Sequence, residues 1–382
     1  MTKFKYSRCA VFWICHSAIV IGISSVVIFS LFLPFSCSKS PVGFAEMERD
    51  SLSHFKKDIT PEDSLSFGQF LPCGRASNLF LGKNDKYEAR ILLSFPLIDS
   101  SAQNITKITI HFYTSDTANY RFKIYPLTTR WNSSATWRMA SEDVQWKEPG
   151  GDFLDVPLAE GVVQKDSFSL EIPRPLLETI LHQSTGFIIL AEENRHSFRL
   201  ASIKTSPRLI FTYGDKERVF LPQFATYIVN FLDTIPSDYF VIGSGYVFWT
   251  YLRYPHPLAS NFKIAEGEMI LSLDLSNSYF LRDTLEVAVF SLKDSFARRR
   301  EKTPFEVSPR IIKTVILPRD SIVSIPVKNL LVDWQNNPEK NFGIFLTLYP
   351  EYRFPSYLLL RKDKLSFRIN FTYIPPVKDR FP

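Results

Sequence analysis

Short apolar runs recur about every 10–15 residues from residue 67 onward, and Pro, Asn, Asp and Ser separate them. In several runs apolar and polar residues alternate, which is the period of a strand with one buried face. Helical spacing is rare, and its best example is Pro175–His182. We predict strands at Ile108–Tyr113, Phe122–Tyr125, Gly186–Leu190, Arg208–Tyr213, Met269–Leu275, Leu285–Phe290, Gly343–Leu348 and Leu365–Tyr373.

Several of these motifs occur twice, in the same order and 154–160 residues apart. The pairs are Asp166–Pro173 with Asp320–Pro326, Gly186–Leu190 with Gly343–Leu348, and Phe211–Tyr213 with Phe371–Tyr373. A period of this length is too long for a solenoid repeat, and it instead indicates two copies of one domain.

The pattern as a whole predicts an all-β protein with two tandem jelly-roll-like β-sandwich domains after an N-terminal apolar membrane or signal segment. We place the lipoprotein signal or signal anchor at 1–37, a polar tether at 38–66, the first β-sandwich at 67–215, the second and divergent β-sandwich at 216–376, and a C-terminal tail at 377–382.

The N-terminal segment has the features of an export signal. Lys3, Lys5 and Arg8 precede a stretch without charge from 10 to 36. This stretch is longer than the roughly 7–15 apolar residues of a secretory signal, and it exceeds the about 20 residues that cross a bilayer. The positive-inside rule keeps such an N-terminus in the cytoplasm and exports the rest of the chain.

The end of this stretch leaves two kinds of anchor open. Ser36 precedes Cys37, as a small residue does at a bacterial lipoprotein cleavage site, but Leu33 lies one position earlier than such sites usually have it. The alternatives are therefore a lipid on Cys37 and an uncleaved signal anchor. With either anchor, we expect an exported protein held at a membrane of the bacterial cell envelope or at the cell surface.

Composition and charge narrow the class of protein further. The chain has 34 Phe and 16 Tyr but only 14 Gly, which favours strands. The formal net charge is +6, and removing the three N-terminal charges leaves 42 basic against 39 acidic residues. This balance is too even for a nucleic-acid-binding protein. Of the four cysteines only Cys73 lies in the expected body, so no disulfide framework is predicted.

Five segments of the first copy follow the strand and turn motifs of a known family, and they are Asn78–Gly82, Arg90–Phe95, Trp131–Trp137, Phe153–Val156 and Ser206–Tyr213. Over about 140 residues they resemble the DNRLRE-type module, a jelly-roll-like β-sandwich also grouped with carbohydrate-binding modules. The turn from Trp131 to Thr136-Trp137 and the closing strand are the most specific features, and the second copy lacks both. The resemblance implies a module of secreted and surface proteins, some of which bind polysaccharide, and it supplies no catalytic residues.

Trp131, Trp137 and Trp146 lie within sixteen residues and are the candidate ligand-binding residues. Flat aromatic faces can stack on sugar rings. The alternative is that these side chains close one end of a sandwich core. Core packing is favoured for Trp131 and Trp137 because they belong to the turn motif, whereas Trp146 lies in the loop-like segment Val144–Gly151 and is the better binding candidate.

No catalytic centre is predicted, because the chain contains no HExxH, GxSxG, P-loop or GxGxxG motif. The six His are scattered without metal-ligand spacing, and we expect no cofactor and place no metal site. Asp152 and Asp155 are the nearest approach to a Ca²⁺ ligand set.

The sequence thus predicts a non-catalytic, membrane-anchored surface protein with a binding or structural role, with polysaccharide or other envelope components as candidate ligands. The alternatives are an adhesion or architectural protein with protein partners, and an accessory part of a glycan-degrading system.

Overall fold

The computed structural model describes the following residues: 54–96, 105–114, 120–164, 166–176, 184–192, 195–202, 206–259, 261–296, 310–352 and 354–373. The expected export signal with Cys37 and the expected C-terminal tail 377–382 lie outside the described residues.

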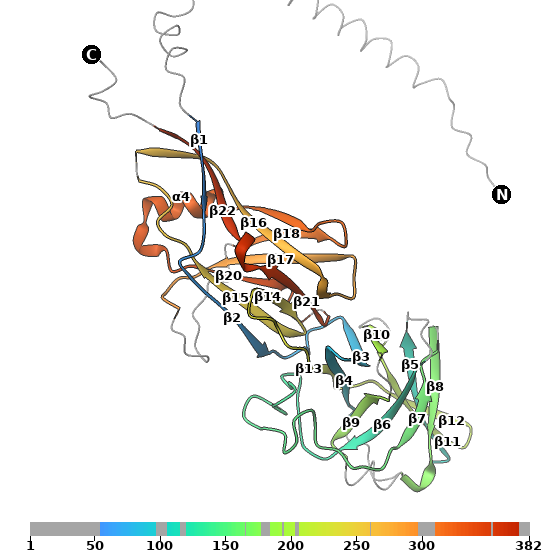
Figure 1. Ribbon diagram of the computed structural model, residues 1–382. Helices are drawn as coiled ribbons and strands as arrows, with labels where there is room; N and C mark the ends of the chain where they lie inside the picture. The colour runs from blue at the N-terminus through green and yellow to red at the C-terminus, as the bar shows by residue number, and fades with distance from the viewer. Residues whose placement is uncertain are drawn as a thin grey trace, which may run out of the picture. The chain divides into compact units, whose positions relative to one another are not determined.

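The described residues form an all-β structure with four antiparallel sheets and one short α-helix, α4 (Lys328–Asn336) (Figure 1). All eight predicted strand segments fall on strands of the structure, as their period-two patterns indicate. The predicted helix Pro175–His182 appears in its described part only as the end of a 3-10 turn, η3 (Arg174–Leu176).

Two of the sheets are formed by residues 78–231. The seven-stranded sheet has the order β10-β3-β4-β9-β6-β7, and β13 pairs with the other edge of β4. The four-stranded sheet has the order β12-β11-β5-β8. The strand bounds are β3 (Asn78–Lys83), β4 (Tyr87–Ser94), β5 (Lys107–Thr114), β6 (Arg121–Leu127), β7 (Ala159–Val162), β8 (Asp166–Ile172), β9 (Gly186–Ala191), β10 (Arg195–Ser202), β11 (Arg208–Tyr213), β12 (Lys216–Phe220) and β13 (Phe224–Phe231).

The other two sheets combine the start of the described chain with its C-terminal part. The six-stranded sheet has the order β1-β22-β16-β21-β14, with β19 also on β16, and the five-stranded sheet has the order β18-β17-β20-β15-β2. The strand bounds are β1 (His54–Ile59), β2 (Asp63–Phe70), β14 (Tyr239–Ser244), β15 (Tyr246–Arg253), β16 (Phe262–Tyr279), β17 (Thr284–Ser291), β18 (Arg310–Ile316), β19 (Ile322–Pro326), β20 (Ile344–Tyr349), β21 (Ser356–Arg361) and β22 (Ser366–Tyr373).

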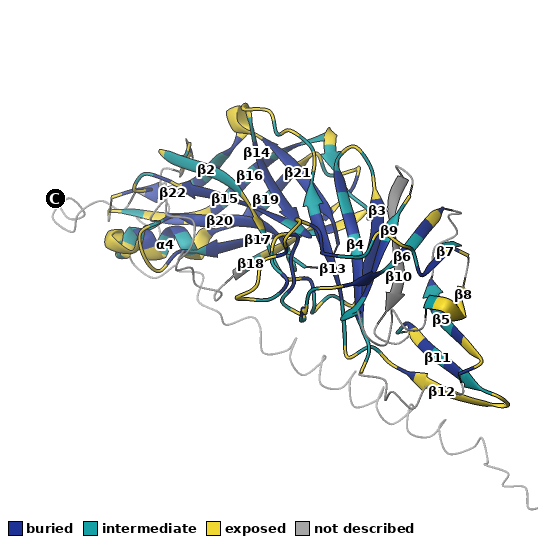
Figure 2. Cartoon of the chain, turned by 90° about the horizontal axis from the view of Figure 1, so that it is seen from below, coloured by how far each residue is buried: buried dark blue, intermediate teal, exposed yellow. Residues whose placement is uncertain are grey.

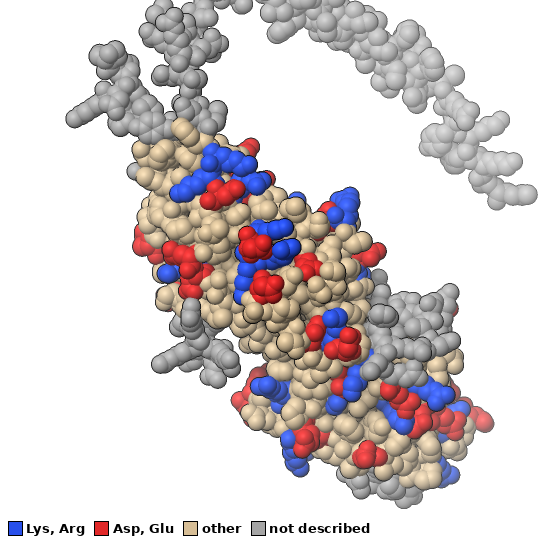
Figure 3. All heavy atoms as spheres, viewed as in Figure 1, with Lys and Arg blue, Asp and Glu red and all other residues tan. Residues whose placement is uncertain are grey.

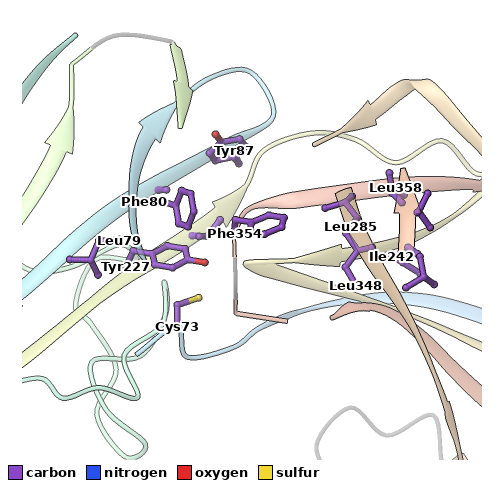
Figure 4. Packing of buried hydrophobic residues seen from close by; sticks show 14 of the residues in the cluster. Cys73, Leu79, Phe80, Tyr87, Tyr227, Ile242, Leu285, Leu348, Phe354 and Leu358 are labelled. Carbon is purple, nitrogen blue, oxygen red and sulfur yellow. The ribbon is translucent and has the colours of Figure 1, made fainter. Parts of the chain in front are cut away.

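The sheets pack through their apolar faces. Phe112 on β5 and Phe168 on β8 meet Phe122 on β6, at ring-centroid distances of 6.1 and 5.8 Å, and so join the four- and seven-stranded sheets. In the C-terminal part, Ile242 and Leu358 of the six-stranded sheet lie near Leu285 and Leu348 of the five-stranded sheet (Figure 4). The buried residues follow the strands in Figure 2, whereas turns and edges are exposed.

The first strands of the structure correct the expected tether at 38–66. Within the described part of that segment, β1 pairs with β22 over six residues, and β2, which begins at Asp63, pairs with β15 over eight. The reason is the alternation in Asp63–Phe70, which brings Leu65 and Phe67 against the aromatic face of the five-stranded sheet.

The expected division between 215 and 216 also differs from the observed pairing. The strands β12 and β13 follow that division, yet they pair with β11 and β4 of the preceding segment. A two-residue connection, Gly214-Asp215, joins β11 to β12, and Gly214 has a φ of 58°, which is the left-handed conformation that glycine adopts easily. The hairpin therefore carries the chain onward within the same sheet.

Candidate functional site

The three candidate tryptophans lie in the long connection between β6 and β7, and all three are buried. Trp131 is 7% exposed, Trp137 6% and Trp146 5%. They cluster with Leu92 and other apolar residues on the seven-stranded sheet. Leu92 lies on β4 between Ile91 and Leu93, which belong to the main core between the sheets. The tryptophan cluster therefore covers the opposite face of β4.

Hydrogen bonds and a cation–π contact fix this connection in place. The indole N–H of Trp146 donates to the carbonyl oxygen of Thr136 at 2.9 Å. Arg90 lies over the ring of Trp137 at 4.5 Å from its centroid, and its Nη1 donates to the carbonyl oxygen of Gly150 at 2.9 Å. The rings therefore pack as core residues, and Trp146 has no open face on which a sugar could stack.

Asp152, one of the two aspartates considered as Ca²⁺ ligands, is a buried hydrogen-bond acceptor in the connection between β6 and β7. Its carboxylate accepts hydrogen bonds from the Thr129 hydroxyl at 2.6 Å and from the backbone N–H groups of Lys147 and Glu148 at 3.1 and 2.9 Å. Burial opposes the charged form, but these hydrogen bonds together lower the pKa of Asp152 below the ordinary aspartate value. The carboxylate is thus a structural centre of the connection.

A second group of side chains joins the seven-stranded sheet to the C-terminal sheets. Tyr227 on β13 is completely buried, and its hydroxyl donates to the carbonyl oxygen of Tyr352 at 2.9 Å. Phe80 packs edge-on against Tyr227 and Phe354, with ring centroids 5.2 and 6.4 Å apart (Figure 4). Cys73 lies beside them, and burial raises the pKa of its thiol to about 12. Such a thiol is not a nucleophile at neutral pH.

The same junction contains a polar network. The hydroxyls of Tyr87 and Tyr279 are 2.9 Å apart. Asp233 accepts hydrogen bonds from Lys86 Nζ at 2.8 Å and from the hydroxyl of Tyr357. Burial opposes ionisation of Asp233, but these two donors lower its pKa, whereas burial and the carboxylate raise the pKa of Tyr357. The charged carboxylate and the protonated hydroxyl are therefore the stable forms.

A small cavity at this junction and a larger hollow elsewhere on the described residues differ in kind. The cavity beside Tyr87, Tyr279 and Tyr357 has a volume of about 10 Å³, which holds no more than one water molecule. A wider surface hollow of about 310 Å³ is lined by Asp238, Tyr239, Arg361, Lys362 and Asp363.

The surface hollow combines an aromatic ring with charges of both signs. The hydroxyl of Tyr239 donates to Asp274 at 2.7 Å, and Lys362 Nζ donates to the carbonyl oxygen of Ser237 at 2.6 Å. Arg361 faces Asp363 at 3.4 Å. No sequence pattern predicts this site, because its residues come from two segments about 120 positions apart that meet only through the pairing of β14 with β21.

On the face seen in Figure 3, acidic and basic groups lie side by side in several patches. No three His, Cys, Asp or Glu side chains of the described residues gather as a metal-ion site requires. Within the same part of the chain, no helix has the length and apolar composition needed to cross a membrane.

No protein-family model matches the chain, and a search of curated proteins finds no match to it. The described residues show a mostly β-strand protein with several antiparallel sheets.

Replacing Trp146 by alanine tests whether its ring is a core element. We expect Trp146→Ala to lower the free energy of unfolding in urea by about 3–5 kcal/mol, because it opens a cavity and leaves the carbonyl of Thr136 without its donor. The matched control is Val144→Ala, at a side chain that is 44% exposed, which should change stability by well under about 1.5 kcal/mol. A Trp146→Ala protein as stable as the parent would contradict the core assignment.

Asp152 also gives a prediction about pH. Its pKa is lower in the folded protein than in the unfolded chain, so its stabilisation is present at neutral pH and is lost as the pH falls below about 4. Asp152→Asn should therefore be less stable than the parent at pH 7, and the difference should shrink in acid. The control Asp155→Asn, at an exposed carboxylate, should show little difference at either pH. Urea unfolding at a series of pH values measures both, and a pH-independent difference for Asp152→Asn refutes the assignment.

Proposed function

We propose that the chain is an exported, membrane-anchored surface protein in which two jelly-roll-like β-sandwich modules, similar to the DNRLRE type, form a rigid unit with a structural or binding role. The proposal of export and anchoring depends on the apolar stretch at 10–36 and on Cys37, which lie outside the described residues. The proposal of paired modules depends on the topology of the sheets.

The strand orders of the two halves support a duplicated module. The order β12-β11-β5-β8 has its counterpart in β1-β22-β16-β19, and the order β7-β6-β9-β4-β13 has its counterpart in β18-β17-β20-β15-β2. The remaining pairs, β3 with β10 and β14 with β21, also correspond. Two sheet systems with the same order of eleven strands are what a duplicated β-sandwich would produce.

Corresponding glycines support the same interpretation. Gly186 at the start of β9 and Gly343 just before β20 have φ angles of 146° and 95°. A Cβ atom on Gly186 would lie 2.5 Å from the carbonyl oxygen of Leu93, and one on Gly343 would lie 2.7 Å from that of Leu252. Leu93 and Leu252 occupy corresponding positions near the ends of β4 and β15. The same close approach of a glycine to a backbone carbonyl therefore occurs in both halves.

The observation that carries the structural role is the junction of Cys73, Tyr227, Phe80 and Phe354 with the Asp233 network. It joins the two sheet systems in one continuous apolar core and adds partly buried hydrogen bonds from Tyr227 and Tyr357. A junction packed in this way opposes hinge motion between the modules. A rigid pair of modules suits a protein that presents partner surfaces at a fixed spacing from a membrane, as an adhesion or architectural protein does.

Surface labelling with mass spectrometry tests the location. Cells that produce the chain are treated with a lysine reagent that does not cross membranes, and the membrane fraction is then digested and analysed. We expect labelled lysines of the body in intact cells, together with either an acylated Cys37 or an intact Met1. A cytoplasmic protein of the same cells is the control for leakage. Recovery of the chain in the soluble fraction, or lysines labelled only after lysis, would refute the proposal.

A second candidate function is polysaccharide binding at the surface hollow, because Tyr239 and the surrounding polar groups supply donors and acceptors of the kind that sugar hydroxyls use. Retention on immobilised envelope polysaccharides measures it. We expect Arg361→Ala to reduce retention at least several-fold, with Arg319→Ala, at a side chain that is 73% exposed and outside the hollow, as the matched control. Equal retention of both variants and the parent would exclude this hollow as the binding site.

A further inference from the structure

The structure has two halves, one built on β3–β11 and the other on β14–β22. The two strands that precede each half in the sequence pair with strands of the other half. We call β1 and β2 (His54–Phe70) the N-terminal arm, and β12 and β13 (Lys216–Phe231) the inner arm. The inner arm precedes β14 but pairs with β11 and β4. The N-terminal arm precedes β3 but pairs with β22 and β15. The two arms are therefore exchanged between the halves.

Both arms dock in corresponding ways. The second strand of each arm pairs over eight residues, β2 with β15 and β13 with β4. The residue just before each of these strands makes the same backbone contact, since Glu62 N–H donates to the carbonyl oxygen of Arg253 at 2.8 Å and Gln223 N–H to that of Ser94 at 2.7 Å. The docking site for an arm therefore occurs twice in the structure. In each case the two strands of the arm pair with strands of two different sheets.

The arms differ in how the chain connects them to their docking sites. The inner arm follows β11 after the two-residue turn Gly214-Asp215. This short turn keeps β12 beside β11 of the same chain, so the inner arm cannot reach a second chain. The N-terminal arm reaches the body only through residues 71–77, which lead to β3 in the other half. Its partner β22 is the last strand, and the paired residues Asp58 and Arg368 are 310 positions apart in the sequence. Only non-covalent contacts hold this arm on β15 and β22.

These contacts are extensive and specific for the arm. Phe67 packs against Trp249 and Phe345, with ring centroids 5.9 and 5.8 Å apart. The hydroxyls of Ser66 and Thr250 are 2.6 Å apart. At the exposed edge Asp58 meets Arg368 at 3.4 Å. A site left without its arm would expose an apolar face together with two unpaired strand edges, which readily template the addition of another strand.

We propose that the N-terminal arm is an exchangeable closing element, and that its docking site on β15 and β22 accepts the same arm from a second copy of this chain. An arm from a second copy makes every contact that the chain's own arm makes. The two states differ in the course of residues 71–77, which includes the buried Cys73 of the junction, and in the entropy of association. High local concentration therefore favours the exchanged pair. The inference goes beyond the proposed function and does not depend on it.

Disulfide trapping between two tagged full-length chains tests the proposal. One chain carries Asp58→Cys and the other Arg368→Cys, two exposed positions whose side chains face each other across β1 and β22. Both are produced in the same cells, whole-cell lysates are oxidised, and dimers are separated without reductant. We expect a dimer that carries both tags, with a peptide linking positions 58 and 368. Cells with either variant alone control for the native cysteines.

The inner arm supplies the matched control. Thr212 and Glu217 are paired across β11 and β12, next to the short turn, so Thr212→Cys and Glu217→Cys in separate chains should give at least several-fold less mixed dimer. A single chain with both Asp58→Cys and Arg368→Cys confirms that the first pair can form its bridge. If that bridge forms within one chain while the mixed chains give no more dimer than the inner-arm pair, the proposal is refuted.

Discussion

The structure depends on burying both faces of its central strands. In β4, Ile91 and Leu93 belong to the main core between sheets, whereas Leu92 between them belongs to the cluster that contains Trp131, Trp137 and Trp146. A strand buried on both faces needs a covering layer on its outer side, because an exposed apolar face would otherwise remain in water. The long connection between β6 and β7 supplies that layer for the seven-stranded sheet.

The five-stranded sheet meets the same constraint in a different way. Its outer face presents Trp249, Tyr251 and Phe345 together with Phe67 of its own edge strand β2, and Phe296 after β17 packs over Phe67 and Tyr251. The abundance of Phe and Tyr thus has a structural cause, since large flat side chains cover much apolar area with few rotatable bonds.

The period-two patterns identified the strands because alternation is a local property of the sequence. Partner choice is not local, and so the pairing of β1 with β22 and of β2 with β15 could not be derived from the sequence. The polar residues Lys56, Lys57 and Asp58 look like part of a tether, yet they are the exposed positions of an edge strand. The burial of Trp146 was equally hidden, because its partner Thr136 meets it only within the folded connection. The surface hollow likewise needs β14 and β21 to pair before its residues come together.

The exchange of arms changes what counts as a structural unit in this chain. A segment from 67 to 215 would lack β12 and β13, and would leave the edges of β11 and β4 unpaired. A segment from 216 to 376 would lack β1 and β2, and would leave Trp249 without its neighbour Phe67. Each half is therefore incomplete where the sequence repeat suggests a boundary. The buried junction at Tyr227 strengthens this dependence, because it involves the inner arm in contacts with the C-terminal half as well as with its own sheet. The repeated strand order and this mutual completion make the two halves one structural unit.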